Sequence, residues 1–123
     1  MPWDLLNDRP IYSQIIEIIK LRIISGFYPA GEKLPSVREL AQEAGVNPNT
    51  MQKAFMELER SGLIVTLRTS GRVVTDDAAM IRMAKESIAE TEVEAFLKKM
   101  KELGFSADES WQLAKKVVEE ERA

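Results

Sequence analysis

The sequence predicts a mainly α-helical fold with one small β-hairpin, which places it in the α+β class. Three observations lead to this prediction. Residues 33–63 contain two amphipathic segments with their own start and stop signals, and residues 64–74 contain two short β-rich segments. Residues 76–123 have only helical periodicity. We therefore expect a small helical domain with a hairpin, followed by a helical extension.

Length and composition limit the class of protein. The 123 residues are 45% hydrophobic and 30% charged, which is typical of a soluble globular protein. The chain has neither an apolar run of the ~20 residues that cross a bilayer nor a secretory signal, so we expect a cytoplasmic protein. It contains no Cys and no His. Zinc sites and His-dependent catalysis are therefore excluded, and we expect neither a metal nor a cofactor nor enzymatic activity.

Local signals divide the stretch KLPSVRELAQEAGVNPNTMQKAFMELERSGL into two helices. Ser36 and Glu39 have the spacing of a capping box, which begins the first helix, and Gly45 can adopt the left-handed conformation that ends it. Asn47 is a preferred N-cap and Pro48 a preferred first helical residue, so the second helix begins there and ends at the next Ser-Gly pair. Two helices joined by so short a turn form a helix-turn-helix.

The second helix has one apolar and one polar face. The apolar residues recur at helical spacing and are expected in the core: Met51, Ala54, Phe55 and Leu58. The opposite face combines amides and cations without a carboxylate: Asn49, Gln52, Lys53, Met56 and Arg60. Amides pair with adenine edges, and cations contact guanine or phosphate. An ordinary solvated face has a similar composition, so the neighbouring elements must decide between the two interpretations.

A hairpin follows directly. Residues 64–66 and 72–74 are predicted strands, joined by a connection of hairpin length that contains Gly71. Arg68 and Arg72 flank the turn. A hairpin with a basic tip after a helix-turn-helix is typical of a wing, which contacts a minor groove or the phosphate backbone. The alternative is an ordinary hairpin with solubilising arginines.

Further elements are predicted on both sides. Pro10 leads a helix of about 16 residues, and a short N-terminal arm is expected to pack on the body. Residues 32–34 are expected to form a very short strand. A long helix is predicted from about residue 77 to Gly104, with a bend at Glu90–Glu92, and Ser106 begins a last helix by a second capping box.

We thus predict a winged helix-turn-helix DNA-binding domain at residues 1–75 and a helical C-terminal dimerisation region at residues 76–123. The first range has nine Lys/Arg against eight Asp/Glu, and the second eight against twelve, so only the first is mildly basic. The two amphipathic tail helices could pack on their own subunit, but a two-fold partner is favoured because pairing two half-sites increases affinity and specificity. The expected dimerisation residues are Ile81, Ala84, Ile88, Phe96, Leu97, Met100, Leu103, Trp111 and Val117.

At this point the motifs themselves suggest a family. RPIYSQI, followed by KLPSVRELAQEAGVNPNTMQKAFMELERSGLI, resembles the GntR family of bacterial winged-helix transcription regulators over residues 9–75, and the tail is similar to that of its YtrA subfamily. The resemblance implies a homodimeric regulator, usually a repressor, on a palindromic operator. YtrA-like members often control operons for ABC transporters or envelope-stress functions. The wing departs from the family pattern: Thr69 replaces a glycine, and Gly71–Val74 lacks the usual threonine and aromatic residue.

The resemblance implies DNA contact for Arg38, for the front of the second helix and for the wing glycine. Together with the polar face and the basic hairpin, the expected DNA-binding set is Lys33, Ser36, Arg38, Asn47, Asn49, Thr50, Gln52, Lys53, Arg68, Gly71 and Arg72. One alternative is a winged-helix protein-interaction module that does not bind DNA. A small-molecule effector of unknown identity could also bind beside the aromatic residues, which core packing explains equally well: Trp3, Tyr12, Tyr28 and Trp111.

Overall fold

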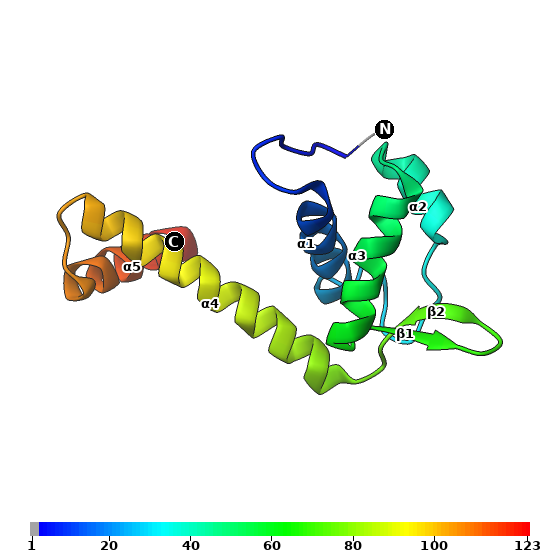
Figure 1. The fold of residues 1–123 in the computed structure, drawn as a ribbon. Helices are drawn as coiled ribbons and strands as arrows, with labels where there is room; N and C mark the ends of the chain where they lie inside the picture. The colour runs from blue at the N-terminus through cyan, green and yellow to red at the C-terminus, as the bar shows by residue number, and fades with distance from the viewer. Residues whose placement is uncertain (1–2) are drawn as a thin grey trace. The chain divides into compact units, whose positions relative to one another are not determined.

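The computed structural model describes residues 3–123 and has the expected mainly α-helical fold with one β-hairpin. Its elements follow in the order α1 (Ile11–Ile24), α2 (Val37–Ala44), α3 (Pro48–Ser61), β1 (Ile64–Leu67), β2 (Gly71–Val74), α4 (Ala78–Glu102) and α5 (Ala107–Arg122) (Figure 1). None of the helices in this range is both long and apolar enough to cross a membrane. The described residues form two compact units, which we call the winged unit (up to Lys85) and the tail unit (Glu86–Ala123).

The predicted helix ends are confirmed in the helix-turn-helix. The backbone N–H of Glu39 donates to Ser36 Oγ and the N–H of Ser36 donates to the Glu39 carboxylate, both at 3.1 Å, so the capping box is complete. Gly45 ends α2 at φ 74°, in the left-handed region that glycine tolerates. Asn47 Oδ1 accepts from the N–H of Asn49 at 2.8 Å and caps α3. Short-range chemistry therefore sets the turn between α2 and α3.

The core of the winged unit lies between α1, α2 and α3, and the hairpin and the start of α4 complete it. Ile15 and Ile19 of α1, Leu40 of α2 and Phe55 of α3 are fully buried in one apolar cluster. All four apolar residues predicted for α3 are buried. The polar face of α3 is consequently left at the surface.

A third short segment extends the two-stranded sheet. Lys33 forms an isolated bridge with Val73, and the backbone N–H of Val74 and of Leu34 donate to Glu32 and Arg72 carbonyls at 2.9 and 3.0 Å. The very short strand expected at residues 32–34 is thus reduced to one bridge at Lys33 with its flanking backbone hydrogen bonds. Because a lone hairpin is marginally stable, the extra pairing on β2 helps to hold the wing on the helices.

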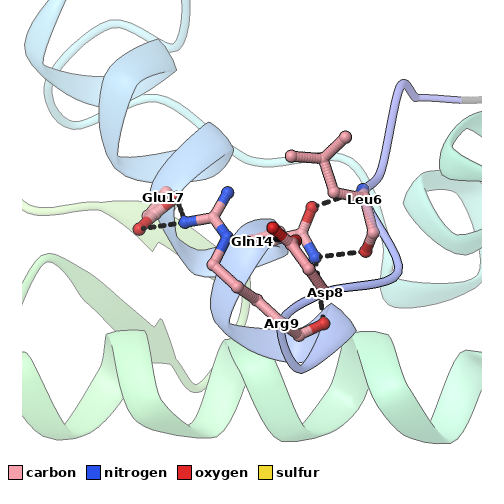
Figure 2. Close-up of polar contacts among 5 residues, drawn as sticks. All are labelled: Leu6, Asp8, Arg9, Gln14 and Glu17. Atoms are coloured by element: carbon pink, nitrogen blue, oxygen red, sulfur yellow. Dashed lines mark hydrogen bonds and ion pairs between the residues drawn. The ribbon is translucent and has the colours of Figure 1, made fainter.

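Gln14 anchors the N-terminal arm, a role that the sequence analysis did not predict. Its amide is buried and exchanges two hydrogen bonds with the backbone of Leu6, both at 2.7 Å, and it donates to the Arg9 carbonyl at 3.1 Å (Figure 2). Arg9 also pairs with Glu17 at 3.4 Å. These contacts confirm that the arm packs on the body.

The helices that follow the wing differ from the prediction at one point. Asp77 begins α4, since its carboxylate accepts from the N–H of Ala79 and Met80 at 3.1 and 3.2 Å. The helix then continues through Glu90–Glu92, where a bend was expected, because polar residues on an exposed helix face do not interrupt the backbone bonding. The second capping box, at Ser106, is confirmed.

Candidate nucleic-acid interface

A groove of about 600 Å³ lies in the winged unit, between the start of α2, the polar face of α3 and the hairpin. It brings together residues from three separate parts of the chain. Six members of the expected DNA-binding set line it: Lys33, Ser36, Arg38, Gln52, Gly71 and Arg72. A concave surface of this composition combines guanidinium, ammonium and amide groups. These groups donate hydrogen bonds to the acceptor atoms of base edges and phosphates.

Arg38 lies in the first turn of α2, and its side chain is exposed. Among the described residues it forms no ion pair, so its guanidinium is free to bind a ligand. Glu39 is the one carboxylate that lines the groove. Hydrogen bonds from the backbone and side chain of Ser36 hold the pKa of Glu39 below its ordinary value, so it remains ionised as the helix cap.

The other predicted residues of α3 do not share this groove. Asn49, Thr50 and Lys53 line a separate shallow hollow with Ile11 and Tyr12 of α1. The ammonium of Lys53 lies 4.2 Å from the centroid of the Tyr12 ring, a cation–π distance. Of the predicted DNA-binding residues of α3, Gln52 alone lines the groove on the hairpin side. The polar face thus divides into two parts that helical periodicity alone did not separate.

The two wing arginines occupy different environments. Arg68 is exposed at the tip of the hairpin, and no carboxylate within the described part of the chain lies at ion-pair distance from it. Arg72 is 27% exposed, and its Nε donates to the Glu59 carboxylate at 2.5 Å. Its guanidinium also lies 5.3 Å from the Phe55 ring centroid. Arg72 therefore has an intramolecular partner, which the sequence prediction missed because residues 13 positions apart meet only through the strand register.

The expected dimerisation residues also fall into two groups. Ile81 and Ala84, in the first turns of α4, are partly buried against the core of the winged unit. In the tail unit, large apolar side chains are exposed instead, including Trp111 at 62% and Val117 at 53%. Three more of the predicted dimerisation residues are exposed: Phe96, Leu97 and Leu103. Ile88 and Met100 are partly buried.

Three of the four aromatic residues suggested for an effector pocket take part in contacts within the winged unit. Tyr12 lies beneath Lys53, and the Trp3 and Tyr28 rings lie 4.7 and 5.5 Å from the Arg22 guanidinium. Arg22 also pairs with Glu43 at 2.9 Å, and the Trp3 indole donates to the same carboxylate at 2.6 Å. These aromatic side chains hold the arm and the helices together.

Comparison with known proteins gives a consistent picture. A family model described as bacterial regulatory proteins, gntR family, matches residues 11–74. The chain is 41% identical to the transcriptional repressor YtrA of Bacillus subtilis over 95 residues, which is 72% of this chain and 73% of that protein. A GntR family transcriptional regulator from Listeria monocytogenes is 39% identical and superimposes with a TM-score of 0.83, covering 91% of this chain and 98% of the other.

A further solved structure contains DNA. The DNA-binding domain of AraR in complex with operator ORX1 is 30% identical to this chain, with a TM-score of 0.52 over 61% of this chain and 92% of that domain. The family model spans residues 11–74, which include all the residues that line the groove. The AraR domain shows that a fold similar to part of this chain binds an operator in another protein.

Proposed function

The chain belongs to the GntR family of bacterial regulatory proteins, and we propose that it is a homodimeric repressor that binds a palindromic operator. As a member of this family of transcription regulators it is not an enzyme, and its resemblance to YtrA-like regulators is confirmed. The observation that carries the proposal is the groove beside α3, where the cationic side chains of Lys33 and Arg38 and the amide of Gln52 converge next to the wing. We place its action in the cytoplasm, where the chromosome is accessible.

In this proposal α3 enters the major groove of DNA and Gln52 meets base edges, while Arg38 contacts guanine or phosphate. Asn49, Thr50 and Lys53 form the second part of the surface, on the side of α1, and contact the adjacent strand. Apart from the two wing arginines, the remaining members of the expected set lie at the helix starts and beside or within the hairpin, where backbone and side-chain donors suit phosphate contacts: Lys33, Ser36, Asn47 and Gly71.

The tail unit supports the homodimer. Many of its large apolar side chains are exposed, more than two helices that face only water would carry. Large exposed apolar surfaces mark interaction sites. A second copy of the same chain is the partner that fits, because two-fold symmetry presents two α3 helices to two half-sites about one DNA turn apart. By its resemblance to YtrA-like regulators, we propose that the controlled operon encodes a transporter or an envelope-stress function.

The test begins with selection of bound sequences from a random DNA pool. The proposal predicts enrichment of an inverted repeat with two half-sites, bound with an affinity that falls steeply with salt. Enrichment of no sequence, or a single unrepeated site, would contradict it. Repression is then tested by placing the selected site between a promoter and a reporter gene, where the protein should lower expression.

Arg38 provides a residue-level test on the selected operator. Arg38→Ala should weaken binding by ~1–3 kcal/mol, the range for loss of one base-reading pair. Lys115→Ala in the exposed part of α5 removes a charge far along the chain and is the matched control, which should leave affinity unchanged. Equal affinities of the two variants in fluorescence anisotropy would remove Arg38 from the interface.

A further inference from the structure

One carboxylate connects α3, the helix proposed to enter the major groove, to both strands of the wing. Glu59, in the second half of α3, accepts a hydrogen bond from Thr66 Oγ1 of β1 at 3.1 Å and another from Arg72 Nε of β2. Thr66 and Arg72 lie directly opposite each other in the hairpin register. The two oxygens of a single carboxylate therefore hold a cross-strand pair on one side of α3.

The environment of this cluster makes it stronger than a typical surface ion pair. Glu59 and Arg72 are only 30% and 27% exposed, and the Arg72 guanidinium lies over Phe55, which is fully buried. Exposed ion pairs contribute little because water screens them, whereas partial burial and two converging hydrogen bonds strengthen the contact. Thr66, Phe55 and Arg72 also line the groove described above. The two wing members of the cluster, Thr66 and Arg72, thus line the proposed DNA-binding surface, and Glu59 supports them from α3.

We propose that Glu59 is a positioning residue that fixes the wing relative to α3, the proposed recognition helix. Arg72 and Thr66 are its hydrogen-bond partners in the wing. This inference rests on the proposed function as a DNA-binding regulator. It assigns Arg72 to the connection between helix and wing, and it leaves Arg68 as the wing cation that contacts phosphate. A four-residue pair of strands has little rigidity of its own, so a fixed attachment to α3 reduces the cost of ordering the wing on DNA.

The direction in which one substitution changes operator affinity distinguishes this positioning role from a purely electrostatic one. Removing a carboxylate next to the proposed DNA-binding groove should strengthen binding if charge alone matters, because the field becomes more positive. If Glu59 positions the wing, Glu59→Ala should instead weaken operator binding, by roughly 3- to 10-fold, since a net intramolecular hydrogen bond contributes modestly. Glu57→Ala is the matched control: Glu57 lies on the same helix and pairs with exposed Arg60 at 2.7 Å, and its removal should leave binding unchanged or tighter.

The salt dependence of binding separates the two arginines. Arg68→Ala should lower the slope of log affinity against log salt concentration by about one, the effect of losing one phosphate contact. Arg72→Ala should lower the affinity without changing that slope. The double variant Glu59→Ala/Arg72→Ala should bind no more weakly than the weaker single variant, because both substitutions break the same connection.

Hydrogen exchange in the free protein tests the connection without DNA. Backbone amides of β1 and β2 should exchange faster in Glu59→Ala than in wild type, and at the wild-type rate in Glu57→Ala. The inference is overturned if Glu59→Ala binds the operator as tightly as wild type, or if its hairpin amides exchange at the wild-type rate. If the wild-type protein selects no DNA, the proposed function fails, and the exchange comparison still decides whether Glu59 holds the wing.

Discussion

The winged unit and the tail unit use their apolar residues in opposite ways. In the winged unit, Phe55 is fully buried among residues from three helices and the hairpin. In the tail unit, Phe96 is 40% exposed, and the only residue classed as buried in the described part of α5 is Ser110. The winged unit therefore completes its own core, whereas the tail unit has amphipathic helices whose apolar faces need another surface. This difference is the physical basis for assigning DNA binding to one and self-association to the other.

The same substitution in the two units gives the largest expected contrast. Phe55→Ala should lower the free energy of unfolding by about 3–5 kcal/mol, because it removes a buried ring and leaves a cavity. Phe96→Ala should cost much less in the subunit, and its effect should depend on protein concentration because it acts on association. Denaturant unfolding at several protein concentrations measures both. Equal, concentration-independent losses would mean that the tail unit has a closed core of its own.

A charge on the tail surface should separate association from folding. Val117→Asp is expected to convert the dimer to a monomer in analytical ultracentrifugation, because a dimer interface would have to bury an unpaired carboxylate. Operator affinity should fall by about 100-fold, since binding of two linked reading helices is lost. Gln112→Asp, at an exposed polar position of α5, is the control and should remain dimeric. A dimeric Val117→Asp protein would place the interface elsewhere.

Two capping boxes of the same type, one in each unit, give a smaller and more local comparison. Ser36→Ala and Ser106→Ala should each lower helix stability by about 0.5–2 kcal/mol, the usual cost of losing an N-cap side chain. We expect Ser36→Ala to lower the unfolding midpoint of the winged unit and Ser106→Ala to increase hydrogen exchange mainly at the start of α5. If both variants affected the same amides, the two units would unfold together.

The smallest expected effect is the response of these caps to acid. Hydrogen bonds from the serine of each box, backbone first and then side chain, hold the pKa of Glu39 and of Glu109 below the ordinary value. A lowered pKa in the folded state means that the unfolded state binds protons first, so this contribution is present at neutral pH and decreases as pH falls through the folded-state pKa. Thermal unfolding between pH 7 and pH 3 should show the decrease in wild type and a weaker one in Ser36→Ala. An identical profile in the two proteins would contradict it.

Much of the fold could be predicted because its signals are local. The capping box at Ser36, the N-cap at Asn47 and the apolar period of α3 each operate within a few residues, and the structure confirms them. The burial of Gln14 could not be predicted, because a glutamine on a helix is normally expected to face solvent. Its hydrogen-bond partners come from the backbone of the arm, which only the tertiary structure brings close. For the same reason the Glu59–Arg72 pair was missed: it depends on how β1 and β2 are paired and on how the hairpin packs on α3.

The candidate site was predicted as one continuous polar face, but the structure separates Gln52 from Lys53. Adjacent helical residues point about 100° apart, so one faces the hairpin and the other faces α1. Sequence periodicity identifies the exposed side of a helix, whereas the neighbours of each exposed residue depend on tertiary packing. The two wing arginines illustrate the same limit, because only their environments distinguish a free cation from a paired one.

The stoichiometry of the protein–DNA complex tests the central claim most directly. The measurement is the mass of the complex formed with a duplex that carries the selected sequence, obtained by native mass spectrometry or by light scattering after size exclusion. We predict two protein chains per duplex, with footprints on two half-sites about one turn, or 34–36 Å, apart. A single chain per duplex, or no complex at a salt concentration near physiological, would contradict the account.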